Sequence, residues 1–212
     1  FAEMKKDPTK TIILVTHSMD AGKRYCDKAI LIKDGEIVVS GNKDDVADQY
    51  TLENLKVQEA EQKAHAAAVN AGTEYPAGLS ERVPVLNVRA EDSQLVKTAD
   101  PFRFLVDYEF NEDVEFYLTL TLLDMKRGGI IYDTAADLHQ TKRGRQTVTF
   151  ELPLDAICNG DYRLTAQLRS LPDPSNIKSN QQLAYTDESR SCDFAVRIPG
   201  NEGYGLRSEE HT

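Results

Sequence analysis

The sequence is poor in cysteine and lacks long apolar runs, and each of these absences excludes a class of protein. Its three cysteines are far apart and show no paired spacing, so neither a disulfide framework nor a zinc site is predicted. The histidines likewise show no spacing typical of metal ligands, and we expect no metal site. No apolar run approaches the roughly 18 residues that span a bilayer, and no basic leader precedes a hydrophobic stretch.

The sequence also lacks an excess of positive charge. Its net charge of −10 disfavours nucleic acid and anionic membrane surfaces as partners, because both attract clustered Lys and Arg. Hydrophobic residues make up 40% and charged residues 28% of the 212 residues, which is typical of a folded protein. Because domains commonly run to about 100 to 150 residues, we expect more than one unit. The chain begins at Phe1, within what reads as a helix, which predicts a fragment boundary there.

The first 41 residues predict a strand, a helix and a hairpin. Residues 11–16, Thr-Ile-Ile-Leu-Val-Thr, form a continuous apolar and β-branched run, typical of a strand buried on both faces in a parallel sheet. His17 follows its end, and residues 19–27 suit a short helix. Residues 29–33 and 36–40 flank Asp34-Gly35, a strong hairpin signal.

A helix and then a β-domain are predicted for the rest of the chain. Residues 43–69 are rich in Ala, Glu, Gln and Lys without Pro or Gly, which favours a helical connector, and Gly and Pro mark a linker over 70–80. Beyond residue 83, apolar residues alternate with polar ones in run after run, as in 102–110, 116–122, 148–152, 162–168 and 194–198. Strands of this kind without intervening helices predict two antiparallel sheets packed face to face, an immunoglobulin-like or jelly-roll β-sandwich.

Residues 11–41, TIILVTHSMDAGKRYCDKAILIKDGEIVVSG, resemble the end of an ABC-transporter nucleotide-binding domain. The resemblance implies that His17 is the switch histidine, which contacts the γ-phosphate of ATP. A side chain at the carboxyl end of a parallel strand points into the crevice where such sheets bind ligands, where it can contact phosphate or position water.

The ATP-binding motifs of that family are missing from the sequence. It has no G-x-x-x-x-G-K-[ST] loop to cradle phosphates, no signature Ser-Gly-Gly stretch and no acidic metal-binding strand before the histidine. We therefore expect no ATP hydrolysis by this chain and no cofactor bound to it. The resemblance implies that the full-length subunit is an ATPase that binds ATP and Mg.

The β-domain beyond the connector limits the resemblance to those ABC ATPase subunits that carry an additional C-terminal domain. The chain resembles the ATPase subunits that export O-antigen, teichoic acid or related polysaccharides (Wzt-like), some of which carry a C-terminal carbohydrate-binding sandwich. The resemblance implies an α/β remnant of the nucleotide-binding domain over 1–42, a connector over 43–82, the sandwich over 83–207 and a tail over 208–212. It also implies three partners, namely a polysaccharide, a membrane permease and a second copy of the subunit, and a peripheral location at the inner face of the cell membrane.

The polar faces of three predicted strands supply the candidate sugar-binding residues. Planar polar groups can pair with sugar hydroxyls, and an aromatic ring can stack on a pyranose. The candidates are Arg103, Asp107, Tyr117, Thr119, Arg163, Gln167 and Arg169.

Three other interpretations of this β-domain stay open. The polar faces can simply be the solvated side of a sheet, or the domain can be a structural or regulatory dimerisation module that binds no sugar. Residues 191–198 could pair such a dimer by extending a sheet edge. Neighbouring carboxylates such as Asp107 and Glu109 could also be imagined as a glycosidase pair, but carboxylates on an exposed strand usually serve solubility.

Overall fold

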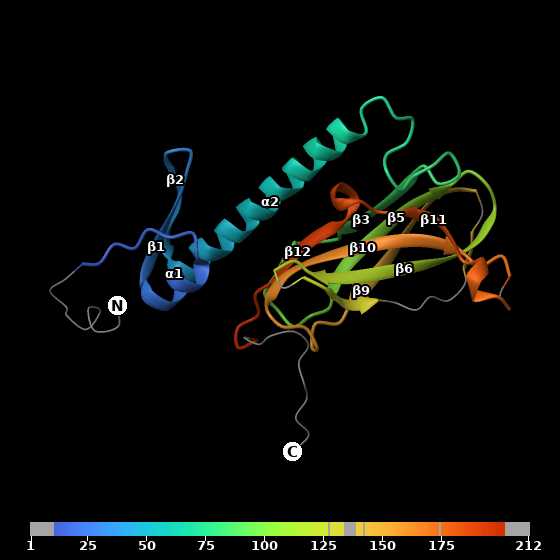
Figure 1. Ribbon diagram of the computed structural model, residues 1–212. Coiled ribbons are helices and arrows are strands. Elements are labelled where there is room, and N and C mark those ends of the chain that lie inside the picture. The colour runs from blue at the N-terminus through green and yellow to red at the C-terminus, as the bar shows by residue number, and fades with distance from the viewer. Residues whose placement is uncertain (1–10, 127, 134–138, 142, 174, 202–212) are drawn as a thin grey trace, which may run out of the picture. The chain divides into compact units, whose positions relative to one another are not determined.

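The computed structural model describes residues 11–126, 128–133, 139–141, 143–173 and 175–201 (Figure 1). The chain divides into two compact units, residues 1–56 and residues 57–212, and each is described by itself. No helix in the described ranges combines the length and apolarity needed to cross a bilayer.

The first unit contains the predicted short helix and hairpin. Helix α1 (Met19–Tyr25) begins after Ser18, whose hydroxyl accepts a hydrogen bond from the Ala21 N–H (3.3 Å). Strands β1 (Lys28–Lys33) and β2 (Glu36–Asn42) pair antiparallel. Asp34 and Gly35 both have positive φ, 53° and 83°, as the tight turn between twisted strands requires. Both predictions are confirmed.

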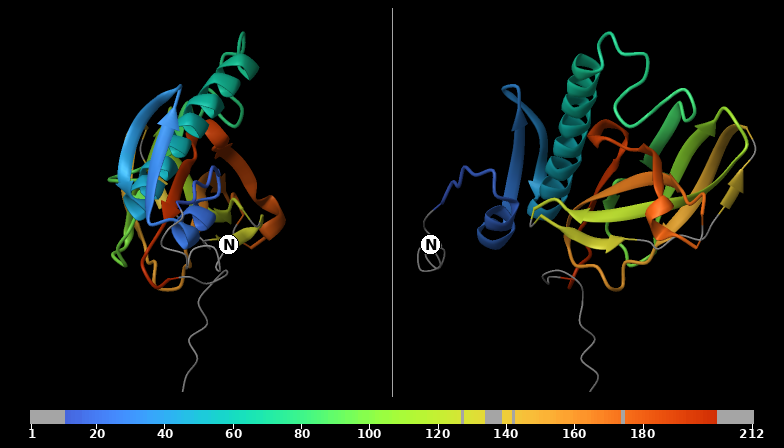
Figure 2. Two further views of the ribbon diagram at one scale, coloured as in Figure 1. Left: turned by 90° about the vertical axis from the view of Figure 1, so that its left-hand side faces the viewer. Right: turned by 45° about the vertical axis from the view of Figure 1, so that its right-hand side comes forward.

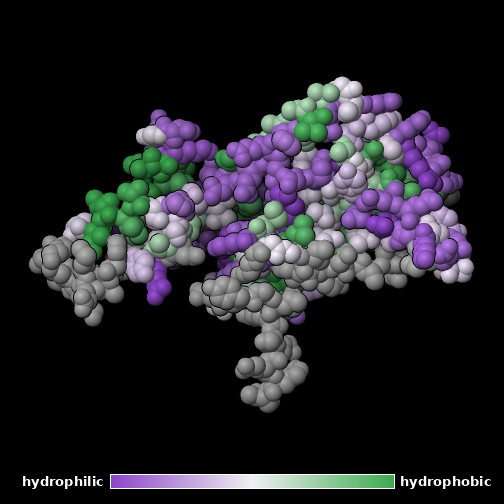
Figure 3. Space-filling model, in the orientation of Figure 1, coloured by the Kyte–Doolittle hydropathy of each residue, from purple (hydrophilic) through white to green (hydrophobic). Residues whose placement is uncertain are grey.

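The predicted strand over residues 11–16 is not formed. These residues have no strand partner in the structure, and three of their apolar side chains are exposed, Ile12, Ile13 and Val15, the last two to 85% and 93%. A strand buried on both faces needs parallel neighbours, and the described part of this unit has only the β1–β2 hairpin. Apolar residues over this segment and the hairpin form the green area at the left of Figure 3.

Helix α2 (Lys43–Val69) has the bounds that its composition predicts. Its first turns bury Val46, Ala47 and Leu55. The Lys33 ammonium contacts the Glu53 carboxylate (2.8 Å) and links the β1–β2 hairpin to the helix. Most of its other side chains are partly or fully exposed, as expected of a connector.

The second unit is a β-sandwich of two sheets, which can be followed in Figures 1 and 2. The smaller sheet has the strand order β3-β5-β9, formed by β3 (Val85–Ala90), β5 (Phe102–Phe110) and β9 (Gly144–Leu152).

The larger sheet has the order β4-β12-β10-β6-β7, with β11 also paired to β10 and β8 to β6. Its pairings are antiparallel except for β4 with β12. Its strands are β4 (Leu95–Val96), β6 (Val114–Asp124), β7 (Ile130–Asp133), β8 (His139–Thr141), β10 (Gly160–Ser170), β11 (Gln181–Tyr185) and β12 (Cys192–Val196).

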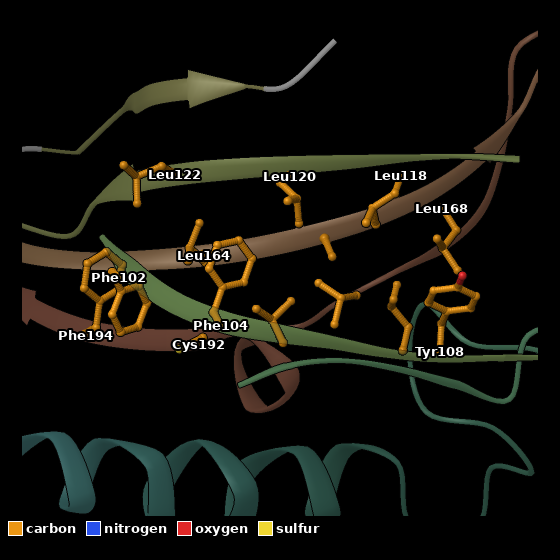
Figure 4. Packing of buried hydrophobic residues seen from close by; sticks show 14 of the residues in the cluster. Phe102, Phe104, Tyr108, Leu118, Leu120, Leu122, Leu164, Leu168, Cys192 and Phe194 are labelled. Carbon is orange, nitrogen blue, oxygen red and sulfur yellow. The ribbon is translucent and has the colours of Figure 1, made fainter. Parts of the chain in front are cut away.

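The core lies between the two sheets and is built by the alternating apolar residues (Figure 4). The rings of Phe102 and Phe194 stack across the sandwich with centroids 4.2 Å apart, and Phe104 stacks on Phe150 at 5.5 Å. The most deeply buried large side chains are Tyr162, Phe110, Phe116, Phe194, Leu86, Leu122 and Leu168. The prediction of a β-sandwich is confirmed.

Strand β12 has neighbours on both sides. It pairs with β10 along its length, and Ala195 and Val196 pair with β4. The Ala195 and Arg197 N–H groups donate to the carbonyls of Gln94 and Val96 (2.7 and 2.8 Å). The end of the C-terminal strand is therefore not the open edge that the sequence suggested, because β4 pairs with Ala195 and Val196.

Candidate functional site

The outer face of the larger sheet carries a cluster of polar side chains from β6, β10, β11 and the residue just before β11. We call the five residues Tyr117, Gln167, Arg169, Asn180 and Gln182 the polar platform. In the strand register, Arg169 is opposite Tyr117 on one side and Gln182 on the other. Because alternate residues on these strands, such as Leu118 and Leu168, fill the core, the platform residues point outward.

Hydrogen bonds join all five platform residues. Arg169 donates from Nε to Asn180 Oδ1 (2.8 Å) and from Nη1 to Gln167 Oε1 (2.9 Å). Gln182 Nε2 donates to the same Gln167 oxygen (3.2 Å), and Asn180 Nδ2 donates to the Tyr117 hydroxyl. The mutual contacts hold one guanidinium, three amides and a phenol in place before any ligand arrives.

The platform is half-open to solvent. Tyr117, Gln167, Arg169 and Asn180 are partly exposed and Gln182 is exposed. Thr119, which is opposite Gln167 in the register, adds a partly exposed hydroxyl beside it. Amides, hydroxyls and a guanidinium offer both donors and acceptors, which suits neighbouring sugar hydroxyls, and a tyrosine ring suits the apolar face of a sugar.

Arg163 lies on the same face of β10 but has a different role. Its side chain is only 8% exposed, and it donates from Nε and Nη2 to both oxygens of Asp193 (2.6 and 2.9 Å). Its Nη1 also contacts the Glu188 carboxylate (3.3 Å). Hydrogen bonding to Asp193 raises the Arg163 pKa despite burial. These contacts assign the guanidinium to the junction of β10 with β12.

Arg103 and Asp107 lie on the outer face of the other sheet, away from the platform. Arg103 contacts the carboxylates of Glu91 (3.0 Å) and Glu151 (3.6 Å). The structure therefore brings together Tyr117, Thr119, Gln167 and Arg169 of the predicted residues, and separates these two from them.

Asp107 is a buried link between strands β3, β5 and β9. Its oxygens accept from Arg89 Nε (2.8 Å) and Thr147 Oγ1 (2.6 Å). Burial acts to raise the Asp107 pKa, but the hydrogen bonds from Arg89 and Thr147, with the charges of Arg89 and Arg145, outweigh it and lower the pKa. A carboxylate held in this way ties three strands together.

His17 lies in the first unit, in an exposed bend after residues 11–16. In the described ranges no cluster of three or more His, Cys, Asp and Glu side chains could hold a metal ion. The predicted tail, residues 208–212, and the end of the predicted sandwich at 207 lie outside the described residues.

Sequence reasoning missed Asn180 and Gln182. They belong to a short stretch around β11 that follows a Pro-rich turn, and only its last three residues, Leu183 to Tyr185, are apolar or aromatic. The pair Gln181-Gln182 before an apolar group was the available signal. The pairing of β11 with β10 is a tertiary contact, which the alternation of apolar and polar residues alone does not indicate.

The comparisons with known proteins point to transport ATPases. No protein-family model matches the chain. It is 26% identical over 181 residues to the O-antigen export system ATP-binding protein RfbB of Myxococcus xanthus, which covers 76% of this chain and 40% of that protein. It is 39% identical over 57 residues to the choline transport ATP-binding protein OpuBA of Bacillus subtilis, which covers 25% of this chain and 15% of that protein.

The chain thus spans less than half the length of these two relatives. Among solved structures, the C-terminal domain of wzt aligns with a TM-score of 0.48 at 15% identity, over 66% of this chain and 87% of that one. The match to the O-antigen export protein is too long to be confined to residues 1–56, so it includes part of the sandwich unit. The chain is therefore related to the ATP-binding subunits of polysaccharide ABC exporters.

Proposed function

We propose that the sandwich binds carbohydrate of a polysaccharide through the polar platform, and that this binding selects the polymer for ATP-driven export. The observation that carries the proposal is the hydrogen-bonded set of Tyr117, Asn180, Arg169, Gln167 and Gln182 on an outer sheet face. A joined set is pre-organised, so less side-chain entropy is lost on binding.

The relation to an O-antigen export protein supports a glycan as the ligand. In this proposal the polymer is an O-antigen, teichoic acid or other cell-wall polysaccharide, and the platform contacts its hydroxyls. Binding requires no covalent chemistry. The paired carboxylates imagined for a glycosidase are not favoured, because Asp107 is held by Arg89 and Thr147.

The rest of the proposal concerns the whole subunit. It would bind ATP and Mg, contact a membrane permease and a second copy of itself, and lie at the inner face of the cell membrane. His17 would contact the γ-phosphate. The boundaries in this proposal are a remnant of the nucleotide-binding domain over 1–42, a connector over 43–82 and the binding domain over 83–207. The exposed apolar residues of the first unit support further protein packing there.

Variants within the platform, compared with a control on the opposite sheet, test the site. Titration calorimetry would measure binding of the surface polysaccharide of the source organism to the chain and to its Arg169→Ala and Gln182→Ala variants. We expect each variant to weaken binding about tenfold, because a hydrogen bond to a charged or pre-organised group contributes roughly 1.5 kcal/mol. Arg103→Ala removes an exposed arginine from the other sheet and is the matched control.

The outcomes separate site and function. Equal losses in Arg169→Ala and Arg103→Ala would move the site away from the platform. Absence of binding to that polysaccharide and to a panel of bacterial glycans, with the fold intact by circular dichroism, would favour the alternative function, a structural or regulatory dimerisation module that binds no sugar.

A further inference from the structure

Strand β9 forms a long open edge of the smaller sheet. It pairs with β5 through nine consecutive positions without a bulge, and in the described ranges no strand pairs with its other side. Residues 145–149 are exposed, including the apolar Val148 at 37%. An open edge presents a row of backbone N–H and C=O groups that can pair with another strand.

Several of the usual protections of such an edge are absent from β9. Natural proteins commonly block edges with Pro, with charged side chains, especially Lys, with a bulge or with a very short strand, and of these β9 carries only the charges of Arg145 and Glu151. The β9 sequence, GRQTVTFEL, has neither Pro nor Lys, and its nine residues are rich in β-branched residues. By contrast, β4 at one edge of the larger sheet has only two residues.

We propose that β9 pairs antiparallel with β9 of a second copy of this chain, about a two-fold axis at Val148. This register is the one that pairs all nine residues. It places Arg145 opposite Glu151, Thr147 opposite Thr149, and Val148 opposite itself. Because the pairing is two-fold, each of the first two contacts occurs twice, and the six strands form one continuous sheet.

Charge complementarity is the reason for choosing a second copy as the occupant. Within one chain the outer face already carries alternating charges, since Arg103 contacts Glu91 (3.0 Å) and Glu151 (3.6 Å). The paired edge continues that series from Glu151 to Arg145 of the second copy, which neighbours its own Glu109 in the register. The row then reads Glu91, Arg103, Glu151, Arg145, Glu109, with opposite charges at each step.

The remaining contacts fit the same register. Thr147 and Thr149 are a β-branched hydroxyl pair on the outer face, which is favourable across antiparallel strands. Val148 lies on the inner row, where its register partner in β5 is the buried Val106. Pairing there covers an apolar side chain that is otherwise exposed. The interface is separate from the polar platform, which lies on the other sheet, so it stands or falls independently of sugar binding.

Charge reversal tests the pairing directly. Sedimentation velocity of the full chain should show a dimer that Arg145→Glu or Glu151→Arg alone weakens about tenfold, because each change places like charges opposite each other twice. An equimolar mixture of the two variants should recover the dimer, since every facing pair is then Glu with Arg. Thermal unfolding checks that each variant is folded, and Arg145→Gln and Glu151→Gln are milder substitutes.

A disulfide tests the register. In a Cys26→Ser background, Val148→Cys should form a cross-linked dimer under mild oxidation, because the two copies of residue 148 face each other. Cys158 and Cys192 are buried, and burial with the Asp193 charge raises the pKa of Cys192 to about 12, so they do not compete. Thr149→Cys, which faces Thr147 of the second copy, should cross-link several-fold less.

Either of two results would overturn the proposal. A wild-type chain that stays monomeric at high concentration has no such interface. A dimer that ignores both charge reversals, with equal cross-linking at residues 148 and 149, is formed by another surface.

Discussion

Arg163 and Arg169 lie six residues apart on the same face of β10, yet their surroundings give them different roles. Arg163 is buried between Asp193 and Glu188, whereas Arg169 is partly exposed and holds the amides of Asn180 and Gln167. In the sequence they are equivalent members of an alternating strand. The difference arises because β12 covers the first half of β10 and β11 pairs with the second half.

We predict that Arg163→Ala destabilises the sandwich by about 3 kcal/mol, because it removes the cationic partner of the Asp193 carboxylate, whose side chain is 13% exposed, and leaves it only the neutral Gln62 amide. Urea unfolding followed by circular dichroism measures the change. Arg169→Ala, from the same strand and face, is the control and should shift stability by less than about 1 kcal/mol. A similar loss in both variants would show that burial does not separate the two arginines.

The lowered pKa of Asp107 predicts that the free energy of unfolding depends on pH. Its pKa is lowered in the folded state, so its contribution is complete above the unfolded value of about 4 and is lost as the pH falls through the folded pKa. We expect Asp107→Asn to flatten the acid side of a plot of unfolding free energy against pH from 7 to 3. An unchanged acid slope in the variant would mean that other carboxylates dominate acid unfolding.

At the scale of elements, the linker between α2 and β3 is fixed to the sandwich by its backbone. The Gly78 carbonyl accepts from the Tyr185 N–H (3.0 Å), and Leu79 packs against the core. Gly78 has a φ of 84°, and an added Cβ would collide with the Tyr185 carbonyl and ring. The glycine and proline content predicts a loop here, but this anchor depends on β11, which is more than a hundred residues away.

We therefore predict that Gly78→Ala destabilises the second unit by about 2 kcal/mol, through backbone strain and the close contact with Tyr185. The thermal midpoint of the sandwich reports the effect. Gly72→Ala is a matched control, because Gly72 has a similar φ of 83° but nothing within 4 Å of an added Cβ. Equal losses would assign the effect to φ alone and remove the role of the contact.

At the scale of the whole molecule, the two proposals use separate surfaces of the sandwich. The platform occupies the outer face of the larger sheet, and the proposed pairing uses the β9 edge of the smaller one. A dimer formed through β9 would leave both platforms uncovered by that contact. Two platforms on one assembly would raise the effective affinity for a repeating polymer, because the second contact becomes intramolecular.

The sequence by itself determined the local elements and the two-layer design. Period-two alternation, as in Phe102 to Phe110, marks which side chains enter the core, and composition sets the bounds of α2. These signals are local, because backbone geometry fixes side-chain direction within a strand or helix. They could not show that the run over residues 11–16 forms no strand, since a buried strand depends on neighbours.

Only the tertiary structure decided which polar residues share a face. Strands β5 and β6 are consecutive in the sequence, yet they belong to opposite sheets, so Arg103 and Asp107 are separated from Tyr117 and Thr119. The platform also needs Asn180 and Gln182, which arrive through the pairing of β11 with β10. The physical reason is that packing between distant segments decides which sheet a strand joins. The alternation of apolar and polar residues along a strand indicates only which side chains face the core and which face solvent.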